Sequence, residues 1–196
     1  MIIDNIEDKM QEYNCVLSTE QLLDLGISKT TLTNYVRDGS LERCGHGYYT
    51  LPGSIEDDMY LMMLRSKHII FSHETALFLN GLSERTPFIH ALTIPSTAAL
   101  PATIKNQCKC YYVKPELHQI GLTERTTSLG NVVRCYDPER TICDIIRSRS
   151  RMDEETFISA IKHYGDYEDK NLINLGRYAE AFRVSRQVRQ YMEVLI

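Results

Sequence analysis

Two short amphipathic segments separated by a single glycine, Gly26, constrain the fold of the N-terminal part of this chain more than any other feature. Ser18, with Gln21 three residues later, has the pattern of a capping box at the start of a helix. Ser28 stands where the N-cap of a second helix over 29–37 would lie. Two short helices joined by a tight glycine turn are typical of a helix-turn-helix.

The second helix of this pair is expected to be polar on its outward face. Leu32, Tyr35 and Val36 recur at helical spacing and form its apolar stripe. The other positions carry hydrogen-bonding or cationic side chains and no acid: Lys29, Thr30, Thr31, Thr33, Asn34 and Arg37. Such side chains can contact phosphates and the edges of guanine, adenine and thymine. A solvated face without a partner is the alternative interpretation.

Residues 41–52 contain two strand-like runs on either side of the turn Gly45-His46-Gly47, which predicts a β-hairpin. A hairpin directly after a helix-turn-helix has the position of a wing. Arg43, His46 and Tyr48 are placed where a wing could lie along a phosphate backbone. We therefore expect a winged helix-turn-helix DNA-binding domain over residues 1–53.

The charge of the chain restricts where DNA could bind. The formal net charge is −4, and residues 1–53 hold four basic and eight acidic side chains. Because phosphate binding needs clustered Lys and Arg, the acids have to point away from the DNA-binding face. Several of them are expected on the exposed side of a first amphipathic helix, whose apolar residues are Ile2, Ile3, Ile6, Met10 and Tyr13.

The remaining residues, 54–196, predict a larger mixed α/β domain, so the expected fold class is α+β. Its first part, 54–82, contains two expected helices, over 54–67 and from Ser72 to Asn80, and could be a helical linker. Strands are expected at 69–71, 88–94, 110–113, 122–127 and 132–136. Further helices are expected from Pro138 onward, over 153–164 and over 169–194.

A second group of basic residues occurs late in the chain: Arg147, Arg149, Arg151, Arg183, Arg186 and Arg189. The last three would share one side of the helix expected over 169–194. They could extend a phosphate track or bind an acidic or RNA partner. Arginine runs are also common as solvated faces or as salt-bridge partners, and both interpretations stay open at this point.

The sequence gives little support for catalysis or for metal binding. Gly53-Ser54 followed by Glu56 and Asp58 superficially resembles the acids with which nucleotidyltransferases hold magnesium, but acids in the first turn of a helix explain it better. The six cysteines lack the spacing of a zinc site. We therefore expect no catalytic residues, no metal and no cofactor.

A cytoplasmic, soluble protein with reduced cysteines is the expectation for localisation. No run approaches the roughly eighteen apolar residues that a bilayer span needs. The first residues also lack the basic and then apolar layout of a signal peptide, so no membrane partner is expected.

Three segments carry a resemblance to a known family. They are the wing at 43–52, the segment 72–82 that begins Ser-His-Glu-Thr-Ala-Leu, and the segment 136–146 that begins Tyr-Asp-Pro-Glu-Arg-Thr. They occur in this order across most of the chain. Together with the helix-turn-helix they resemble the AbiEi-type antitoxins of type IV, abortive-infection toxin–antitoxin systems of bacteria.

The resemblance implies a transcriptional autorepressor that binds inverted repeats in its own promoter through the N-terminal domain. It also implies a C-terminal domain, 54–196, that counters a cognate nucleotidyltransferase toxin without a stable complex. It assigns no residue of that domain to the antitoxin activity. Two alternatives are a protein-interaction adaptor that uses the winged helix, and an enzyme of nucleotide or RNA chemistry within residues 80–196.

Overall fold

The computed structural model describes residues 6, 8–10 and 15–195, with side chains described up to residue 193. The chain forms two compact units. The first consists of Met1–Arg65 with Ser128–Asn131, and the second of Ser66–Thr127 with Val132–Ile196. The boundary expected after residue 53 falls inside the first unit. The expected α+β fold class is confirmed.

The two helices of the expected helix-turn-helix are present in the first unit. They are α2 (Thr19–Asp24) and α3 (Lys29–Arg37). Ser18 and Gln21 form the capping box at the start of α2, with both reciprocal hydrogen bonds made. The Ser28 side chain caps α3 as expected. These local signals are confirmed because each depends on hydrogen bonds between residues only three apart.

The expected hairpin is also confirmed, and it belongs to a three-stranded antiparallel sheet. Strands β1 (Leu17–Ser18), β2 (Glu42–Gly45) and β3 (Tyr48–Thr50) lie in the order β1-β3-β2. Gly47 in the hairpin turn has φ +79°, a conformation that favours glycine. The register shifts at Cys44, which forms a bulge in β2. Strand β1 was not predicted, because two residues cannot show a period.

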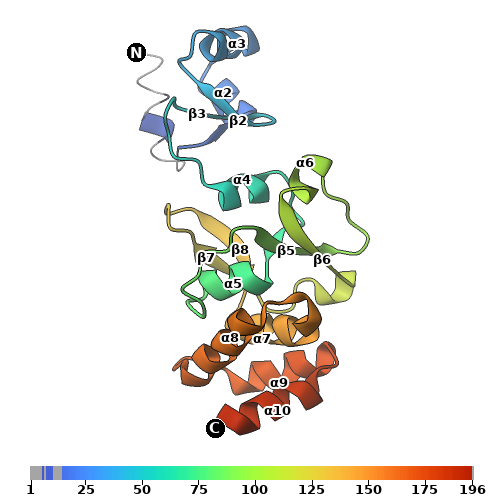
Figure 1. The fold of residues 1–196 in the computed structure, drawn as a ribbon. Helices are drawn as coiled ribbons and strands as arrows, with labels where there is room; N and C mark the ends of the chain where they lie inside the picture. The colour runs from blue at the N-terminus through green and yellow to red at the C-terminus, as the bar shows by residue number, and fades with distance from the viewer. Residues whose placement is uncertain (1–5, 7, 11–14, 196) are drawn as a thin grey trace. The chain divides into compact units, whose positions relative to one another are not determined.

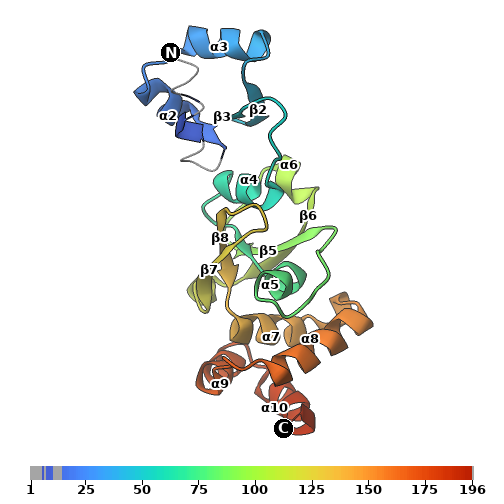
Figure 2. The same ribbon diagram turned by 90° about the vertical axis from the view of Figure 1, so that its left-hand side faces the viewer.

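Helices α2 and α3 pack on one face of this sheet, and helix α4 (Asp58–Leu64) packs on the other (Figures 1 and 2). Alternate strand residues point to opposite faces, so Tyr49 lies in the first core and Tyr48 in the second. The buried residues of the first core are Ile6, Met10, Leu17, Leu22, Ile27, Leu32 and Leu41. Residues 6 and 8–10 are helical. The rest of the expected first helix lies outside the described residues.

The limits expected for the next helix, 54–67, were wrong. Helix α4 begins three residues after Ser54, because the Asp57 carboxylate accepts a hydrogen bond from the Tyr60 backbone N–H at 3.2 Å and caps the helix. The Asn131 side chain also donates to Asp57, at 2.8 Å. Asp57 is therefore buried as a structural cap of the first unit.

The second unit contains a mixed five-stranded sheet. Its strands are β4 (Ile70–Phe71), β5 (His90–Pro95), β6 (Cys108–Val113), β7 (Leu122–Thr126) and β8 (Val132–Tyr136), in the order β6-β5-β4-β8-β7. The short strand β4 is central, antiparallel to β5 and parallel to β8. All five strand positions were predicted to within two residues.

Helices cover one face of this sheet in successive layers. Figures 1 and 2 show α5 (His73–Leu79) between the sheet and helices α7 (Pro138–Arg147) and α8 (Glu154–Asp166). Helices α9 (Leu172–Ala181) and α10 (Ser185–Leu195) lie further out. Every residue of α7 except the last is buried, so this helix forms the centre of the helical layer.

The single helix expected over 169–194 was wrong, because α9 and α10 are separate. The chain reverses at Arg183, which has φ +59°, and its neighbours Phe182 and Val184 are both buried in the core. Apolar residues therefore continue at helical spacing across the break, and no glycine marks it. As a result Arg183 does not share a helix with Arg186 and Arg189.

Candidate nucleic-acid interface

The exposed side of α3 presents the largest group of predicted DNA-binding residues. Lys29, Thr33 and Arg37 are spaced four residues apart and lie on successive turns, and Thr30 and Asn34 lie beside them. All five side chains are exposed. The fold brings them onto one helix face, as the sequence predicted, with no acidic side chain within the helix.

The sixth predicted residue of α3, Thr31, lies on a different side of the helix. It is half-buried, and its hydroxyl oxygen is 2.8 Å from the Ser28 hydroxyl oxygen. The Thr31 backbone N–H also donates to the same oxygen at 3.1 Å. Thr31 therefore supports the helix cap. Thr33 is exposed, but its hydroxyl donates to the Lys29 carbonyl at 2.9 Å.

Arg43 and His46 lie together at the tip of the wing. The Arg43 Nε donates to the Gly45 carbonyl at 3.1 Å, and its Nη2 lies 3.4 Å from Nδ1 of His46. Both side chains are exposed. Tyr48 is half-buried, and its hydroxyl donates to the Leu64 carbonyl at 3.2 Å. Tyr48 therefore attaches the wing to α4.

Two contacts that support the wing were not predicted. Arg65, just after α4, donates from Nη2 to the Cys44 carbonyl at 3.1 Å. On the other side of the wing, the Thr19 backbone N–H donates to the Gly47 carbonyl at 2.8 Å. Arg65 follows the wing by about twenty residues, so sequence spacing gives no signal of its position. Together these contacts fix the wing relative to the start of α2.

Acidic side chains lie beside the α3 face as well as away from it. Asp38 follows Arg37 directly and accepts a hydrogen bond from the Ser40 backbone N–H at 3.0 Å. Hydrogen bonds from Ser40, with a smaller contribution from Arg37, hold the pKa of Asp38 below its ordinary value. The carboxylate is therefore ionised at neutral pH. The positive charge of the face is concentrated toward the N-terminal end of α3.

The late arginines occupy several places in the second unit. Arg147 and Arg151 line one hollow, and Arg147 lines a second hollow with Arg183. The Arg149 guanidinium lies over the Phe157 ring, 4.5 Å from its centre, and 3.7 Å from the Glu154 carboxylate. Arg149 is therefore engaged in contacts within the unit.

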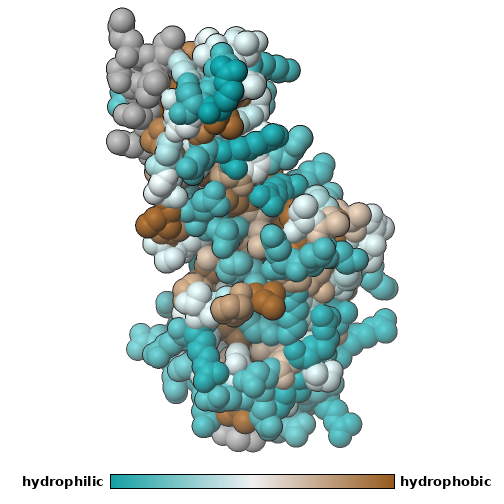
Figure 3. Space-filling model, turned by 45° about the horizontal axis from the view of Figure 1, so that its top comes forward, coloured by the Kyte–Doolittle hydropathy of each residue, from teal (hydrophilic) through white to brown (hydrophobic). Residues whose placement is uncertain are grey.

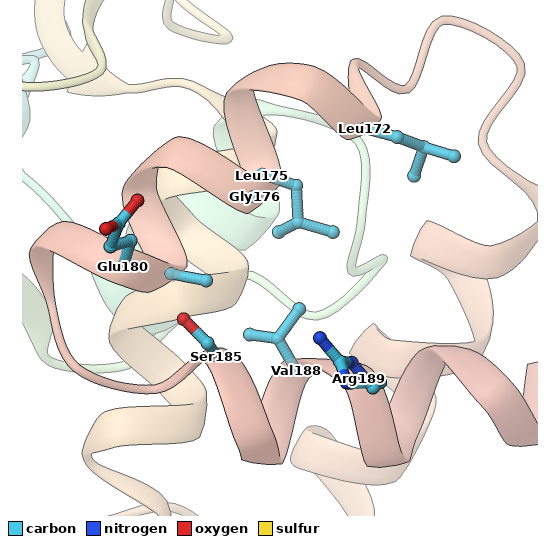
Figure 4. A pocket seen from close by; sticks show the side chains of 8 residues that line it. Leu172, Leu175, Gly176, Glu180, Ser185, Val188 and Arg189 are labelled. Carbon is cyan, nitrogen blue, oxygen red and sulfur yellow. The ribbon is translucent and has the colours of Figure 1, made fainter.

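Arg189 lines a different pocket, between α9 and α10. Figure 4 shows Arg189 and Val188 of α10 opposite Leu172 and Leu175 of α9, around a pocket of about 430 Å³. Arg186 is exposed on α10. The structure thus brings Arg147 near Arg151 and Arg183, whereas Arg189 lies in another pocket.

The features that would indicate a membrane segment or a metal-dependent enzyme were searched over the described residues. None of the described helices has the length and apolar character needed to span a bilayer. No group of three or more His, Cys, Asp or Glu residues is arranged to hold a metal in the same part of the chain. Asp58 lies in the first turn of α4, as expected for a helix start. Hydrophilic residues cover most of the face shown in Figure 3.

The N-terminal module has a counterpart among known protein families. Residues 15–52 match the model of the family described as transcriptional regulator, AbiEi antitoxin. The resemblance to AbiEi-type antitoxins is confirmed for this segment. The AbiEi-type segment contains α2, α3 and the wing, and therefore all the residues predicted to contact DNA. The matching family is one of transcriptional regulators rather than of enzymes.

The chain is also similar to a solved structure over nearly its whole length. The crystal structure of the RV2827C protein from Mycobacterium tuberculosis superimposes with a TM-score of 0.71 and 14% sequence identity. The match covers 99% of this chain and 77% of that one. At this identity the similarity shows a shared fold, in which the AbiEi-type segment and the second unit occur together. No curated protein matches the sequence.

Proposed function

We propose that the protein is an antitoxin and transcriptional autorepressor that binds inverted repeats in its own promoter through α3 and the wing. The observation that carries this proposal is the exposed face of α3, in which Lys29, Thr30, Thr33, Asn34 and Arg37 lie together without an acid in the helix. This face lies within the AbiEi-type segment. Recognition helices of this kind enter the major groove and read base edges from their N-terminal part.

The wing supplies contacts to the DNA backbone in this proposal. Arg43 and His46 are exposed at its tip and lie close enough to act on one phosphate. Thr31 and Tyr48 act indirectly, because their hydroxyl groups cap α3 and attach the wing to α4. Two copies on an inverted repeat add their binding energies, so the protein requires no tight dimer in solution.

The second unit, in this proposal, counters a nucleotidyltransferase toxin in the cytoplasm without forming a stable complex with it. The similarity of fold to a protein of comparable organisation supports a second domain with a role of its own. A reading frame for a nucleotidyltransferase next to the gene would strengthen this part. Co-expression of the chain with that toxin tests it, since rescue of growth without co-purification is the expected result.

The DNA-binding part is tested by titrating labelled DNA from upstream of the gene, and a scrambled duplex, with the purified full chain over a series of salt concentrations. The wild-type chain is expected to prefer the upstream DNA by about a thousandfold or more, as specific DNA-binding proteins do. Replacement of Lys29 and Arg37 by Ala should weaken binding at least tenfold and reduce the salt dependence by about one phosphate contact per residue lost.

Two further variants separate this proposal from the adaptor alternative. Asn34→Ala should reduce the preference for upstream over scrambled DNA by about tenfold, since a bidentate base contact contributes roughly 1–3 kcal/mol of discrimination. A charge-matched control, Lys162→Gln with Arg177→Gln on exposed surfaces of the second unit, should bind as the wild type does. If neither duplex binds at low salt, the DNA-binding proposal is wrong and a protein-binding role for the winged helix is favoured.

A further inference from the structure

The second unit contains a small polar hollow that the proposed DNA-binding function does not use. It lies beside α7 and is lined by side chains from the start of α5, from β6, from α7 and from the residues that follow α7. The residues that matter most are His73, Tyr111, Arg140, Arg147, Ser148 and Arg151. We refer to it as the α7 hollow. Its volume is about 180 Å³.

The α7 hollow is positively charged. Three arginines line it, Arg140, Arg147 and Arg151, against one carboxylate, Asp144. Asp144 is already paired with Arg140, at 3.0 Å between Oδ2 and Nε. Arg147 and Arg151 are both exposed. Two guanidinium groups at the mouth of the hollow are therefore available for an anionic ligand.

One buried donor of the hollow lacks an acceptor. Arg140 is completely buried, and three of its N–H groups have partners: Nε donates to Asp144, and Nη1 donates to the Leu117 and Ile120 carbonyls at 3.0 and 2.7 Å. Nη2 is also buried and has no hydrogen-bond partner among the described residues. Such a group in a folded protein normally has a partner, so its position in a hollow points to a bound ligand.

The walls of the hollow are held in place before any ligand binds. The Tyr111 ring stacks on the His73 ring, with centres 3.4 Å apart, and the Arg151 guanidinium lies 4.1 Å from the centre of the Tyr111 ring. Lys109 donates to the Arg151 carbonyl at 2.7 Å and fixes the turn after α7. His73 has φ +48°, a backbone conformation that is unfavourable for histidine and is found more often at functional sites.

These observations together define the class of ligand. Arginine forks match the oxygen atoms of phosphate in pairs, and the Ser148 hydroxyl, 3.1 Å from Nε2 of His73, adds a polar group at the wall. Pockets for drug-sized molecules are about 300–1,000 Å³, so this hollow accepts a terminal group rather than a whole nucleotide. We propose that the α7 hollow binds a terminal phosphate, either as free phosphate or as a phosphate monoester, between Arg140, Arg147 and Arg151.

The test measures ligand binding to the full-length chain by calorimetry at pH 8, with sodium phosphate, O-phosphoserine and sodium acetate at matched ionic strength. Phosphate should bind and acetate should not. Arg147→Gln and Arg151→Gln, which change exposed side chains, should each weaken phosphate binding about tenfold, equivalent to roughly 1.4 kcal/mol. The charge-matched control Arg177→Gln, on the exposed side of α9, should change it less than twofold.

The two sources of phosphate are distinguished by the ligands. Tighter binding of O-phosphoserine than of phosphate identifies a monoester, and equal binding identifies free phosphate. A second readout is the pKa of His73, followed by NMR, which should rise when a dianion binds beside it. The proposal is overturned if acetate binds as tightly as phosphate, or if Arg147→Gln and Arg151→Gln bind phosphate as Arg177→Gln does.

A role in DNA binding is the other outcome that overturns this proposal. In that case Arg147→Gln and Arg151→Gln would weaken binding to duplex DNA, while phosphate would not bind to the wild type. Failure of the proposed DNA-binding function has a different signature, because it depends on Lys29 and Arg37 in the first unit. The two proposals can therefore fail separately.

Discussion

Arg140 and Asp144 form a buried ion pair on successive turns of α7, with 3.0 Å between Nε and Oδ2. The exposed fractions of the two side chains are 0% and 5%. The guanidinium lies between two aromatic rings, with its central carbon 3.9 Å from the centres of both the Tyr136 and the Phe182 rings. This one side chain therefore connects the end of β8, helix α7 and the break between α9 and α10.

Loss of the carboxylate from this pair should destabilise the protein strongly. Asp144→Ala leaves Arg140 buried without its counter-charge, for which a loss of about 3–5 kcal/mol in the free energy of unfolding is expected. Asp144→Asn keeps the shape and should lose less. Glu155→Ala is the matched control, because its ion pair with Arg85 is exposed and contributes less than about 1 kcal/mol. Urea unfolding measures all three, and equal losses for Asp144→Ala and Glu155→Ala would contradict the structural role.

Gly121 lies directly against Arg140, and this contact should exclude any larger residue. A Cβ atom at Gly121 would lie 2.5 Å from the Arg140 Cβ, and the residue has φ +75°. Gly121→Ala should therefore lower the free energy of unfolding by more than about 2 kcal/mol, through steric overlap added to backbone strain.

Gly130 provides the control for backbone strain alone. It has φ +86°, and a Cβ there would meet nothing within 4 Å. Gly130→Ala should therefore lose only about 1–2 kcal/mol, the strain of a left-handed backbone conformation. Thermal unfolding compares the two variants. If they lose the same amount, the backbone near Gly121 can relax and the contact with Arg140 does not restrict this position.

The elements of the fold that could be predicted from the sequence are those with short-range signals. Ser18 and Ser28 cap α2 and α3 through bonds to residues three positions away, and Asp137 with the following proline begins α7. The break at Arg183 could not be predicted, because the apolar period continues through it and the residue in the left-handed conformation is not glycine. Its cause is tertiary: two separate helices allow Phe182 and Val184 both to be buried.

The same distinction applies to the candidate sites. The face of α3 was predictable, because residues four apart on a helix necessarily lie on one side. The positions of Tyr48 and Arg65 were not, because their partners Leu64 and Cys44 come from other elements. The α7 hollow was not predictable either. Its residues come from α5, β6 and α7, and no short motif joins them.

Tyr48 and Arg43 should affect different properties of the protein, although they are five residues apart. Tyr48→Phe removes the hydroxyl that donates to the Leu64 carbonyl and should lower the free energy of unfolding by about 1 kcal/mol. DNA affinity at 25 °C should change less than about twofold, because the folded population stays near complete. Arg43→Gln should leave stability within about 0.5 kcal/mol, since the side chain is exposed, but weaken DNA binding. The proposed roles are contradicted if Tyr48→Phe loses DNA binding without losing stability.

His73 should make the stability of the second unit sensitive to mildly acidic pH. Burial, together with the neighbouring cations Lys109, Arg140, Arg151 and Arg147, lowers the pKa of His73 well below its ordinary value of 6.5. As pH falls below 6.5, the unfolded chain binds a proton at this position and the folded chain does not. The contribution of His73 is therefore fully present above pH 6.5 and is lost as pH falls toward its folded pKa, by up to about 1.4 kcal/mol per pH unit.

Replacement of His73 should reduce this pH dependence in part. His118 is also buried, and burial lowers its pKa despite the hydrogen bonds to the Thr93 and His68 carbonyls, so it adds a slope of the same sign. Urea unfolding between pH 5 and pH 7.5, in a buffer without phosphate, should show a shallower slope for His73→Gln than for the wild type. The exposed His46 is the control, and His46→Gln should keep the full slope. An unchanged slope in His73→Gln would mean that His73 is protonated as readily in the folded protein as in the unfolded chain. The cations around it would then not produce the positive potential on which phosphate binding in the α7 hollow depends.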